Sequence, residues 1–184
     1  GFVALGLVVD PAGKATGHSS EVGILVAGMG ASGRLYLLGD LSGPYSPPEY
    51  AGIIAKALID WQITDIIVED NFGGDQVEVV LRSEMPDDLN VLTRVHRVNA
   101  SKSKAERAAL AAPAWSSGRV YHVGSPRRFV LLERQMTAFD PSRPPRSQQT
   151  DRMDAAVWAA LWYLGDGTDR TRIRALSSAD AWRA

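Results

Sequence analysis

The first forty residues alternate short apolar runs with polar loops. The run 2–9 (FVALGLVV) holds only apolar residues and glycine, which is typical of a strand buried on both faces, and it ends at Asp10. Two further apolar runs, 22–27 and 35–38, are separated by the turn sequence Gly30-Ala31-Ser32-Gly33. Because so short a connection cannot cross over a sheet, the pattern predicts antiparallel neighbours.

The segment from Ser46 to Trp61 carries the signals of an amphipathic helix. Ser46 is a capping residue, Pro47 takes the first helical position and Glu49 takes the capping-box position. The expected buried stripe repeats at helical spacing and consists of Tyr50, Ile53, Ile54, Ala57 and Trp61. The pattern therefore predicts a helix that covers one face of a sheet.

Strands and helices continue to alternate along the rest of the chain. Strands are predicted at 63–68 and 91–98, a short extended segment at 119–123, and helices at about 75–84, 103–115, 127–139 and 150–164. This order describes a mixed sheet with helices on both faces. We expect one α/β domain at 1–165, with five or slightly more strands, and a polar, arginine-containing tail at 166–184.

Composition narrows the chemistry. The chain has 184 residues, 45% of them hydrophobic and 22% charged, which is typical of a globular domain. The net charge of −1 means that contact with nucleic acid would need local basic clusters. The absence of cysteine excludes disulfides, thiolate metal sites and cysteine nucleophiles. No apolar run approaches the roughly 20 residues of a membrane span, so we expect no membrane partner.

Three carboxylates stand where predicted elements end or begin. Asp10 closes the first strand, Glu69 closes the fourth, and Asp154 lies in the first turns of the last helix. In a mixed sheet these strands can be neighbours, and the helix can pack across their shared edge. Converging carboxylates repel one another unless cations bind between them, and hard oxygen ligands favour Mg²⁺ or Mn²⁺ over zinc. Two divalent ions about 4 Å apart are the usual arrangement where such carboxylates converge.

A purely structural explanation exists for each acid taken alone. An acid after a strand is often an ordinary loop residue, and the helix dipole favours aspartate in a first turn, which would account for Asp151 and Asp154. Spacing alone leaves both interpretations open.

Several local motifs favour the functional interpretation. The segments 8–14 (VVDPAGK), 67–75 (IVEDNFGGD) and 151–159 (DRMDAAVWA) resemble, in the same order, motifs of the C-terminal nuclease domain of tailed-phage large terminases. The segments 118–123 (GRVYHV) and 133–140 (ERQMTAFD) are also similar to parts of that family. The resemblance covers nearly the whole chain and implies a ribonuclease-H-like fold.

The resemblance also implies an activity. It implies an endonuclease, dependent on two Mg²⁺ or Mn²⁺ ions, that cuts concatemeric double-stranded DNA during packaging into the prohead. It places the catalytic and metal-binding carboxylates at Asp10, Glu69 and Asp154. Asp151, three residues earlier on the same helix face, is an auxiliary ligand in this hypothesis.

The same resemblance implies partners and a location. The expected partners are an upstream ATPase motor domain of the same polypeptide, the portal and the small terminase subunit, and the expected location is the host cytoplasm. The chain itself has no Gly-rich phosphate loop ending in Gly-Lys-Ser/Thr, so we do not expect it to hydrolyse ATP.

Basic residues gather after the fifth predicted strand, on the helix 127–139 and in the loop 140–147. Lys102, Lys104 and Arg146 flank the predicted catalytic edge, and we expect them, with Arg97, to hold DNA phosphates without reading sequence. Each could equally belong to a solvated face.

Two other functions fit the same acids. Another nuclease of this fold, such as a junction resolvase or transposase core, needs similar carboxylates. A DNA-binding module could have kept the fold and lost catalysis. The motifs at 67–75 and 151–159 favour the terminase, and the three intact acids argue against loss of catalysis.

Overall fold

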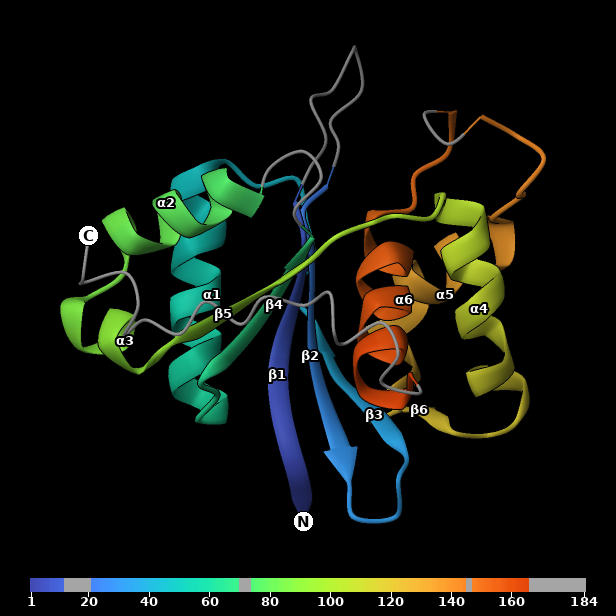
Figure 1. Ribbon diagram of the computed structural model, residues 1–184, viewed down its shortest axis with the longest axis horizontal. Helices are drawn as coiled ribbons and strands as arrows, with labels where there is room; N and C mark the ends of the chain where they lie inside the picture. Colours follow the sequence, from blue (N-terminus) through green and yellow to red (C-terminus); the bar gives the residue numbers. More distant parts are fainter. Residues whose placement is uncertain (12–20, 70–73, 145–146, 166–184) are drawn as a thin grey trace.

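A mixed β-sheet forms the centre of the molecule and separates two layers of helices (Figure 1). The computed structural model describes residues 1–11, 21–69, 74–144 and 147–165. Within these ranges the sheet has six strands in the order β5-β4-β1-β2-β3-β6. The strands are β1 (Phe2–Asp10), β2 (Gly23–Gly30), β3 (Leu35–Asp40), β4 (Asp65–Glu69), β5 (Arg94–Val98) and β6 (Val120–His122).

The strand pairing follows the expected mixed pattern. β1, β2 and β3 are antiparallel neighbours, as their short connections predict. β4 lies parallel to β1 on its other side, β5 lies parallel to β4, and β6 lies parallel to β3. The segment 119–123, which the sequence predicted to be extended, contains β6 and pairs with β3. Within the described residues the sheet therefore has six strands, in line with the five or slightly more expected. The prediction of a mixed sheet is confirmed.

Helices cover both faces of this sheet, as Figure 1 shows. The first layer contains α1 (Pro47–Trp61), α2 (Gly74–Glu84) and α3 (Asp87–Leu92). The second layer contains α4 (Lys104–Ser116), the 3₁₀ turn η1 (Pro126–Phe129), α5 (Val130–Ala138) and α6 (Asp151–Leu164). None of the helices in the described part of the chain has both the length and the apolar character that crossing a bilayer requires.

Burial on both faces explains the continuous apolar run of β1. Leu7 and Val9 belong to the core under the first layer, together with Ile54 of α1. Val8 belongs to the core under the second layer, together with Ala156 of α6. Because side chains alternate along a strand, one covered on both sides must be apolar at successive positions.

The last helix, α6, is buried along most of its length and lies against β1, β2 and β3. Two glycines allow this close approach. A Cβ at Gly23 would collide with the backbone carbonyl of Asp151, and a Cβ at Gly6 would lie 2.6 Å from the hydroxyl of Tyr163. Larger residues at these positions would push α6, and the acids it carries, away from the sheet.

The strand predicted at 91–98 begins only at Arg94, so its first part was wrong. Residues 87–92 form α3 instead. Asp87 and Asp88 occupy the first turn of that helix, where the dipole favours negative charge. Val91 and Leu92 at the end of α3 are apolar, and for that reason the sequence pattern placed the start of the strand too early.

The helix α1 has the predicted capping box, in which the backbone N–H of Ser46 donates to the Glu49 carboxylate at 2.8 Å. Trp61, predicted to be buried, is 36% exposed. It is the last residue of α1, and Gln62 then turns into the left-handed region with φ of 53°. The helix predicted at 127–139 is a 3₁₀ turn followed by α5. The tail predicted at 166–184 lies outside the described residues.

Candidate metal centre

Two predicted acids emerge from adjacent parallel strands. Val9 of β1 pairs with Val68 of β4, so Asp10 and Glu69 follow at the same edge of the sheet. Asp10 is buried, with 7% of its surface exposed, and Glu69 is partly buried. The indole N–H of Trp158 on α6 donates to Glu69 Oε2 at 2.8 Å and fixes that carboxylate.

The start of α6 brings two more acids to this edge. Asp154 is almost fully buried, and its backbone N–H donates to the carbonyl of Thr150 at 2.8 Å. The Thr150 hydroxyl lies 3.4 Å from Asp154 Oδ2. Asp151 accepts a hydrogen bond of 3.3 Å from the backbone N–H of Glu21. We call Asp10, Glu69, Asp151 and Asp154 the acidic cluster.

Burial and mutual charge shift the pKa values of the acidic cluster. Burial raises the pKa of Asp10 well above its ordinary value, and the charges of Asp154 and Glu69 raise it further. Burial also raises the pKa of Asp154 and that of Asp151. The structure therefore brings Asp10, Glu69 and Asp154 together, with Asp151 beside them.

Two cations from the first turns of α4 face these acids. The Lys104 ammonium forms an ion pair with Asp154 and donates to the Thr150 hydroxyl at 2.6 Å. Burial alone would lower the pKa of Lys104, but the Asp154 carboxylate outweighs it and raises that pKa. Arg107, one turn later, places Nη2 at 3.4 Å from Asp154 Oδ1 and 3.5 Å from Glu69 Oε2.

Arg107 is held from several sides. It donates to the carbonyl of Lys102 at 3.0 Å, and its guanidinium carbon lies 5.0 Å from the centre of the Trp158 ring. Its Nε is buried without a hydrogen-bond partner among the described residues. The sequence showed Arg107 only as one of a group of basic residues. Its role as a buried counterion depends on the packing of α4 against α6.

The donor set fits a hard divalent cation, because it consists of carboxylates from three elements. Within the described ranges, no three such side chains are already arranged to hold an ion. Asp154 is engaged at both oxygens by Lys104, Arg107 and Thr150, and Glu69 is engaged at Oε2 by Trp158. The carboxylates are of the kind that binds a divalent cation, and in this structure they contact side chains of α4 and α6.

The four residues predicted to contact DNA differ in their surroundings. Lys102 is exposed just before α4. Lys104 is turned into the acidic cluster instead of lying free on the surface. Arg97 forms an ion pair of 2.7 Å with Glu78. Arg146 lies outside the described residues.

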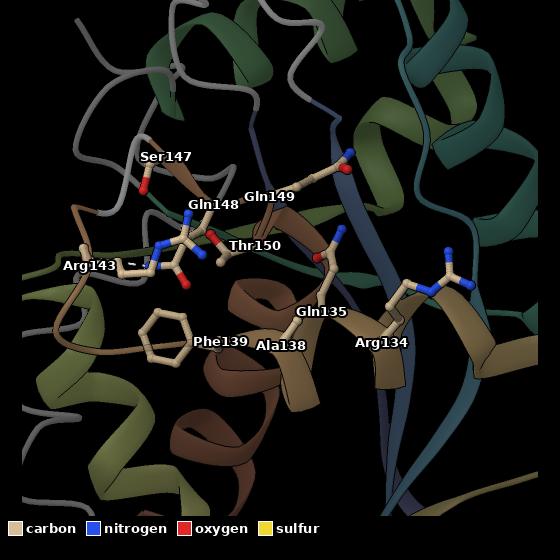
Figure 2. Close-up of a pocket in the computed structure, with 9 residues that line it drawn as sticks. All are labelled: Arg134, Gln135, Ala138, Phe139, Arg143, Ser147, Gln148, Gln149 and Thr150. Atoms are coloured by element: carbon tan, nitrogen blue, oxygen red, sulfur yellow. Dashed lines mark hydrogen bonds between the residues drawn. The ribbon is translucent and has the colours of Figure 1, made fainter.

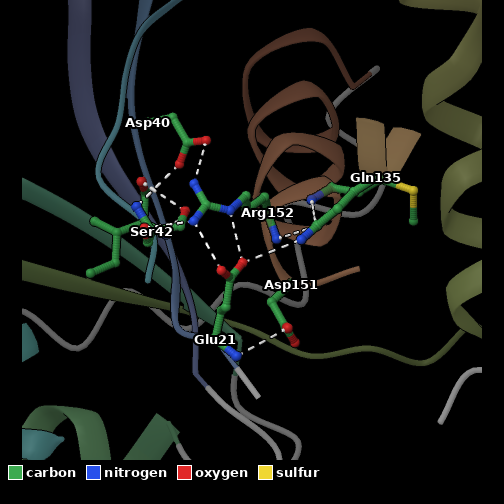
Figure 3. Close-up of polar contacts among 8 residues, drawn as sticks. Glu21, Asp40, Ser42, Gln135, Asp151 and Arg152 are labelled. Atoms are coloured by element: carbon green, nitrogen blue, oxygen red, sulfur yellow. Dashed lines mark hydrogen bonds and ion pairs between the residues drawn. The ribbon is translucent and has the colours of Figure 1, made fainter. Parts of the chain in front are cut away.

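A second polar network anchors the start of α6 (Figure 3). The buried Arg152 guanidinium contacts Glu21 at 2.8 Å, Asp40 at 2.8 Å and the carbonyl of Ser42 at 2.9 Å. The side-chain oxygen of Gln135 on α5 accepts the backbone N–H of Arg152 at 2.9 Å. This network fixes α6 against the ends of β2 and β3, and sequence reasoning missed it because its members are far apart in the chain.

A hollow of about 220 Å³ lies between α5 and the segment that leads into α6 (Figure 2). Its lining consists of Arg134, Gln135, Ala138, Phe139, Arg143, Ser147, Gln148, Gln149 and Thr150. Thr150 belongs both to this lining and to the contacts of Asp154. The hollow therefore adjoins the acidic cluster.

This mixed sheet with helices on both faces is a ribonuclease-H-like fold. The fold resembles the human cytomegalovirus terminase nuclease domain, with a TM-score of 0.58, 16% identity and coverage of 94% of this chain and 89% of that one. It also resembles the yeast mitochondrial Holliday junction resolvase, with a TM-score of 0.55, 10% identity and coverage of 90% and 80%.

The sequence identifies the family. The family model of the terminase RNase H-like domain matches residues 7–162, and the chain belongs to this family. No curated protein matches the sequence.

Proposed function

We propose that this chain is the nuclease domain of a phage large terminase and that it hydrolyses phosphodiester bonds of double-stranded DNA with the help of two Mg²⁺ or Mn²⁺ ions. One observation carries the proposal. Two adjacent strands and a helix bring Asp10, Glu69 and Asp154 to one largely buried edge, where Arg107 contacts both Glu69 and Asp154; burial, and then the neighbouring charges, raise the pKa of Asp10. Lys104 and Arg107 compensate part of this repulsion, and a divalent cation would compensate the rest. Membership of the terminase family supports the same reading.

Asp10, Glu69 and Asp154 would hold the ions, with Asp151 as an auxiliary ligand. Bound ions would supply an activated water and neutralise charge on the phosphate. The protein supplies orientation: Trp158 holds Glu69, and the Arg152 network holds the start of α6, which carries the two aspartates. Burial of the edge keeps bulk water from screening these charges.

DNA would lie across this edge and be held through its phosphates. Lys102 is exposed beside α4 and is suited to such a contact. Arg97 would have to exchange its ion pair with Glu78 for a phosphate. Arg146 completes the proposed set.

Family membership supports a proposal for the biological setting. We propose that the domain cuts concatemeric genomes in the host cytoplasm during packaging into the prohead. It would work with an ATPase motor domain of the same polypeptide, the portal and the small terminase subunit.

Cleavage of supercoiled plasmid tests the activity. The purified chain is incubated with Mg²⁺, Mn²⁺ or EDTA, beside Asp10→Asn and Glu69→Gln. Two exposed acids of the first layer give matched controls, Asp88→Asn and Glu84→Gln. We expect nicking and linearisation that need Mg²⁺ or Mn²⁺, a loss of at least about 100-fold in the two site variants, and wild-type rates in the controls.

Two outcomes would count against this proposal. Cutting that survives in Asp10→Asn and Glu69→Gln would exclude this site. Preferred cutting of a four-way junction over linear duplex would favour the resolvase alternative.

A further inference from the structure

The acidic cluster carries its own counterions, but not enough of them. Among the described residues, four carboxylates face only two cationic side chains, Lys104 and Arg107. Both cations contact Asp154, which is almost fully buried. A divalent ion that approached Asp154 would meet them at contact distance, where like charges repel strongly.

The two cations are held very differently. Arg107 is packed over Trp158, donates to the carbonyl of Lys102, and leaves only 7% of its side chain exposed. Lys104 is held at its ammonium by Asp154 and the Thr150 hydroxyl, and 21% of its side chain is exposed. A lysine ammonium is compact and strongly hydrated and sits on a flexible stem, whereas a stacked guanidinium is fixed by its plane. Lys104 can therefore leave the cluster without disturbing the core, and Arg107 cannot.

We propose that Lys104 is the exchangeable counterion of the acidic cluster: it neutralises Asp154 in the metal-free protein, and a divalent ion binds there as the ammonium leaves. The inference rests on the metal-binding role proposed above and names the residue that sets the affinity. The Lys104 ammonium competes with the divalent ion for Asp154, which lowers the apparent metal affinity. It also stabilises the acidic cluster when no ion is bound.

Removal of the ammonium tests the inference without any measurement of cutting. Mn²⁺ binding to the full chain is measured by calorimetry for wild type, Lys104→Met and Lys104→Arg, in the absence of DNA. We expect Lys104→Met to bind Mn²⁺ about five-fold or more tightly, a coupling typical of sites that share a charge. Lys104→Arg keeps the charge and should bind more weakly than Lys104→Met. In EDTA, Lys104→Met should unfold at a lower temperature than wild type, and Mn²⁺ should raise its midpoint by more.

Lys102→Met is the matched control. Lys102 is exposed and lies two residues earlier, so this variant loses the same formal charge without losing a contact to the acidic cluster. Its Mn²⁺ affinity should stay within about two-fold of wild type, because long-range effects of an exposed charge are screened. An equal gain in both variants would reduce the effect to net charge and would overturn the role of Lys104.

A wild-type measurement keeps the inference testable if Lys104→Met does not fold. The side-chain carbon signal of Lys104 is followed by NMR during titration with Mg²⁺. It should move toward the position of an exposed lysine with the same midpoint as metal binding. A signal that stays unchanged while Mg²⁺ binds would show that the ammonium is not displaced.

The outcomes separate this inference from the proposed function. Equal Mn²⁺ affinity in wild type and Lys104→Met overturns the role of Lys104 alone. Tighter Mn²⁺ binding by Lys104→Met, combined with no DNA cleavage by the wild-type chain, supports the role of Lys104 and contradicts the proposed nuclease activity. No divalent binding in either protein contradicts both.

Discussion

The two helical layers cover the same sheet but bury different chemistry. Under the first layer the core is apolar, with Leu7, Ile54 and Leu81 fully buried, and the described ion pairs of α1 and α2 lie at or near the surface. Under the second layer the buried residues include Arg107, Arg152 and Asp154. Burying charge is costly and is tolerated only with close partners. The difference shows that the first layer serves stability, whereas the second layer also holds the acids in place.

The largest expected effect comes from breaking the anchor of α6. Arg152→Met leaves Glu21 and Asp40 without their shared partner, and loss of one side of such a buried network costs about 3–5 kcal/mol in the free energy of unfolding. Arg82→Met in the first layer removes an exposed i,i+4 pair with Glu78 and should cost about 0.5 kcal/mol or less. Urea unfolding measures both. Similar costs for the two variants would contradict the contrast between the layers.

A cavity in the first layer sharpens the contrast. Ile54→Ala should cost about 2–5 kcal/mol, because Ile54 is fully buried. Its folded fraction should nevertheless bind Mn²⁺ like wild type, since no acid of the cluster packs on α1. Arg152→Met should weaken Mn²⁺ binding even after correction for the unfolded fraction. Calorimetry at a temperature where both variants are folded checks this.

An intermediate effect is expected at Trp158→Phe. The ring that packs under Arg107 remains, but Glu69 loses the indole hydrogen bond of 2.8 Å that orients it. Outer partners of metal ligands typically change affinity about 10-fold or more. We therefore expect weaker Mn²⁺ binding with a modest loss of stability. A Mn²⁺ affinity equal to that of wild type would mean that Glu69 does not bind the ion or needs no orientation.

The smallest effect concerns Asp65, at the opposite end of β4 from Glu69. Burial alone would raise its pKa, but hydrogen bonds from Arg94, His96 and Thr64 outweigh it and lower the pKa to about 2. A folded-state pKa below the unfolded one stabilises the protein above about pH 4, and this contribution is lost as the pH falls toward 2.

Because the Asp65 group is partly exposed, its contribution should stay below about 1 kcal/mol. Urea unfolding of wild type and Asp65→Asn between pH 5 and pH 2 measures it as the difference between two slopes. The variant should lose stability less steeply with acid. Parallel curves would show that these hydrogen bonds do not stabilise the fold.

Much of the fold follows from local patterns. The run 2–9 and the capping signal at Ser46 specify β1 and α1, because burial on both faces and an N-cap leave clear traces in short windows. The positions of Asp10 and Glu69 at strand ends follow for the same reason. The extended form of 119–123 also follows from the local pattern, but its place in the sheet as β6 does not, because that depends on pairing with β3.

The partners of the acids could not be predicted in the same way. Lys104 and Arg107 face Asp154 only because α4 packs against α6, more than forty residues later in the chain. Arg152 meets Glu21 and Asp40 across still longer separations. A single sequence shows that a residue is basic, but not whether it points to DNA or to a buried carboxylate.

The most direct test of the central claim is a crystal structure of the chain with Mn²⁺, with the ion located by its anomalous scattering. We expect manganese between Asp10, Glu69 and Asp154, with the Lys104 ammonium moved off Asp154. An acidic cluster that stays free of manganese at saturating concentration, with Lys104 still paired to Asp154, would contradict it.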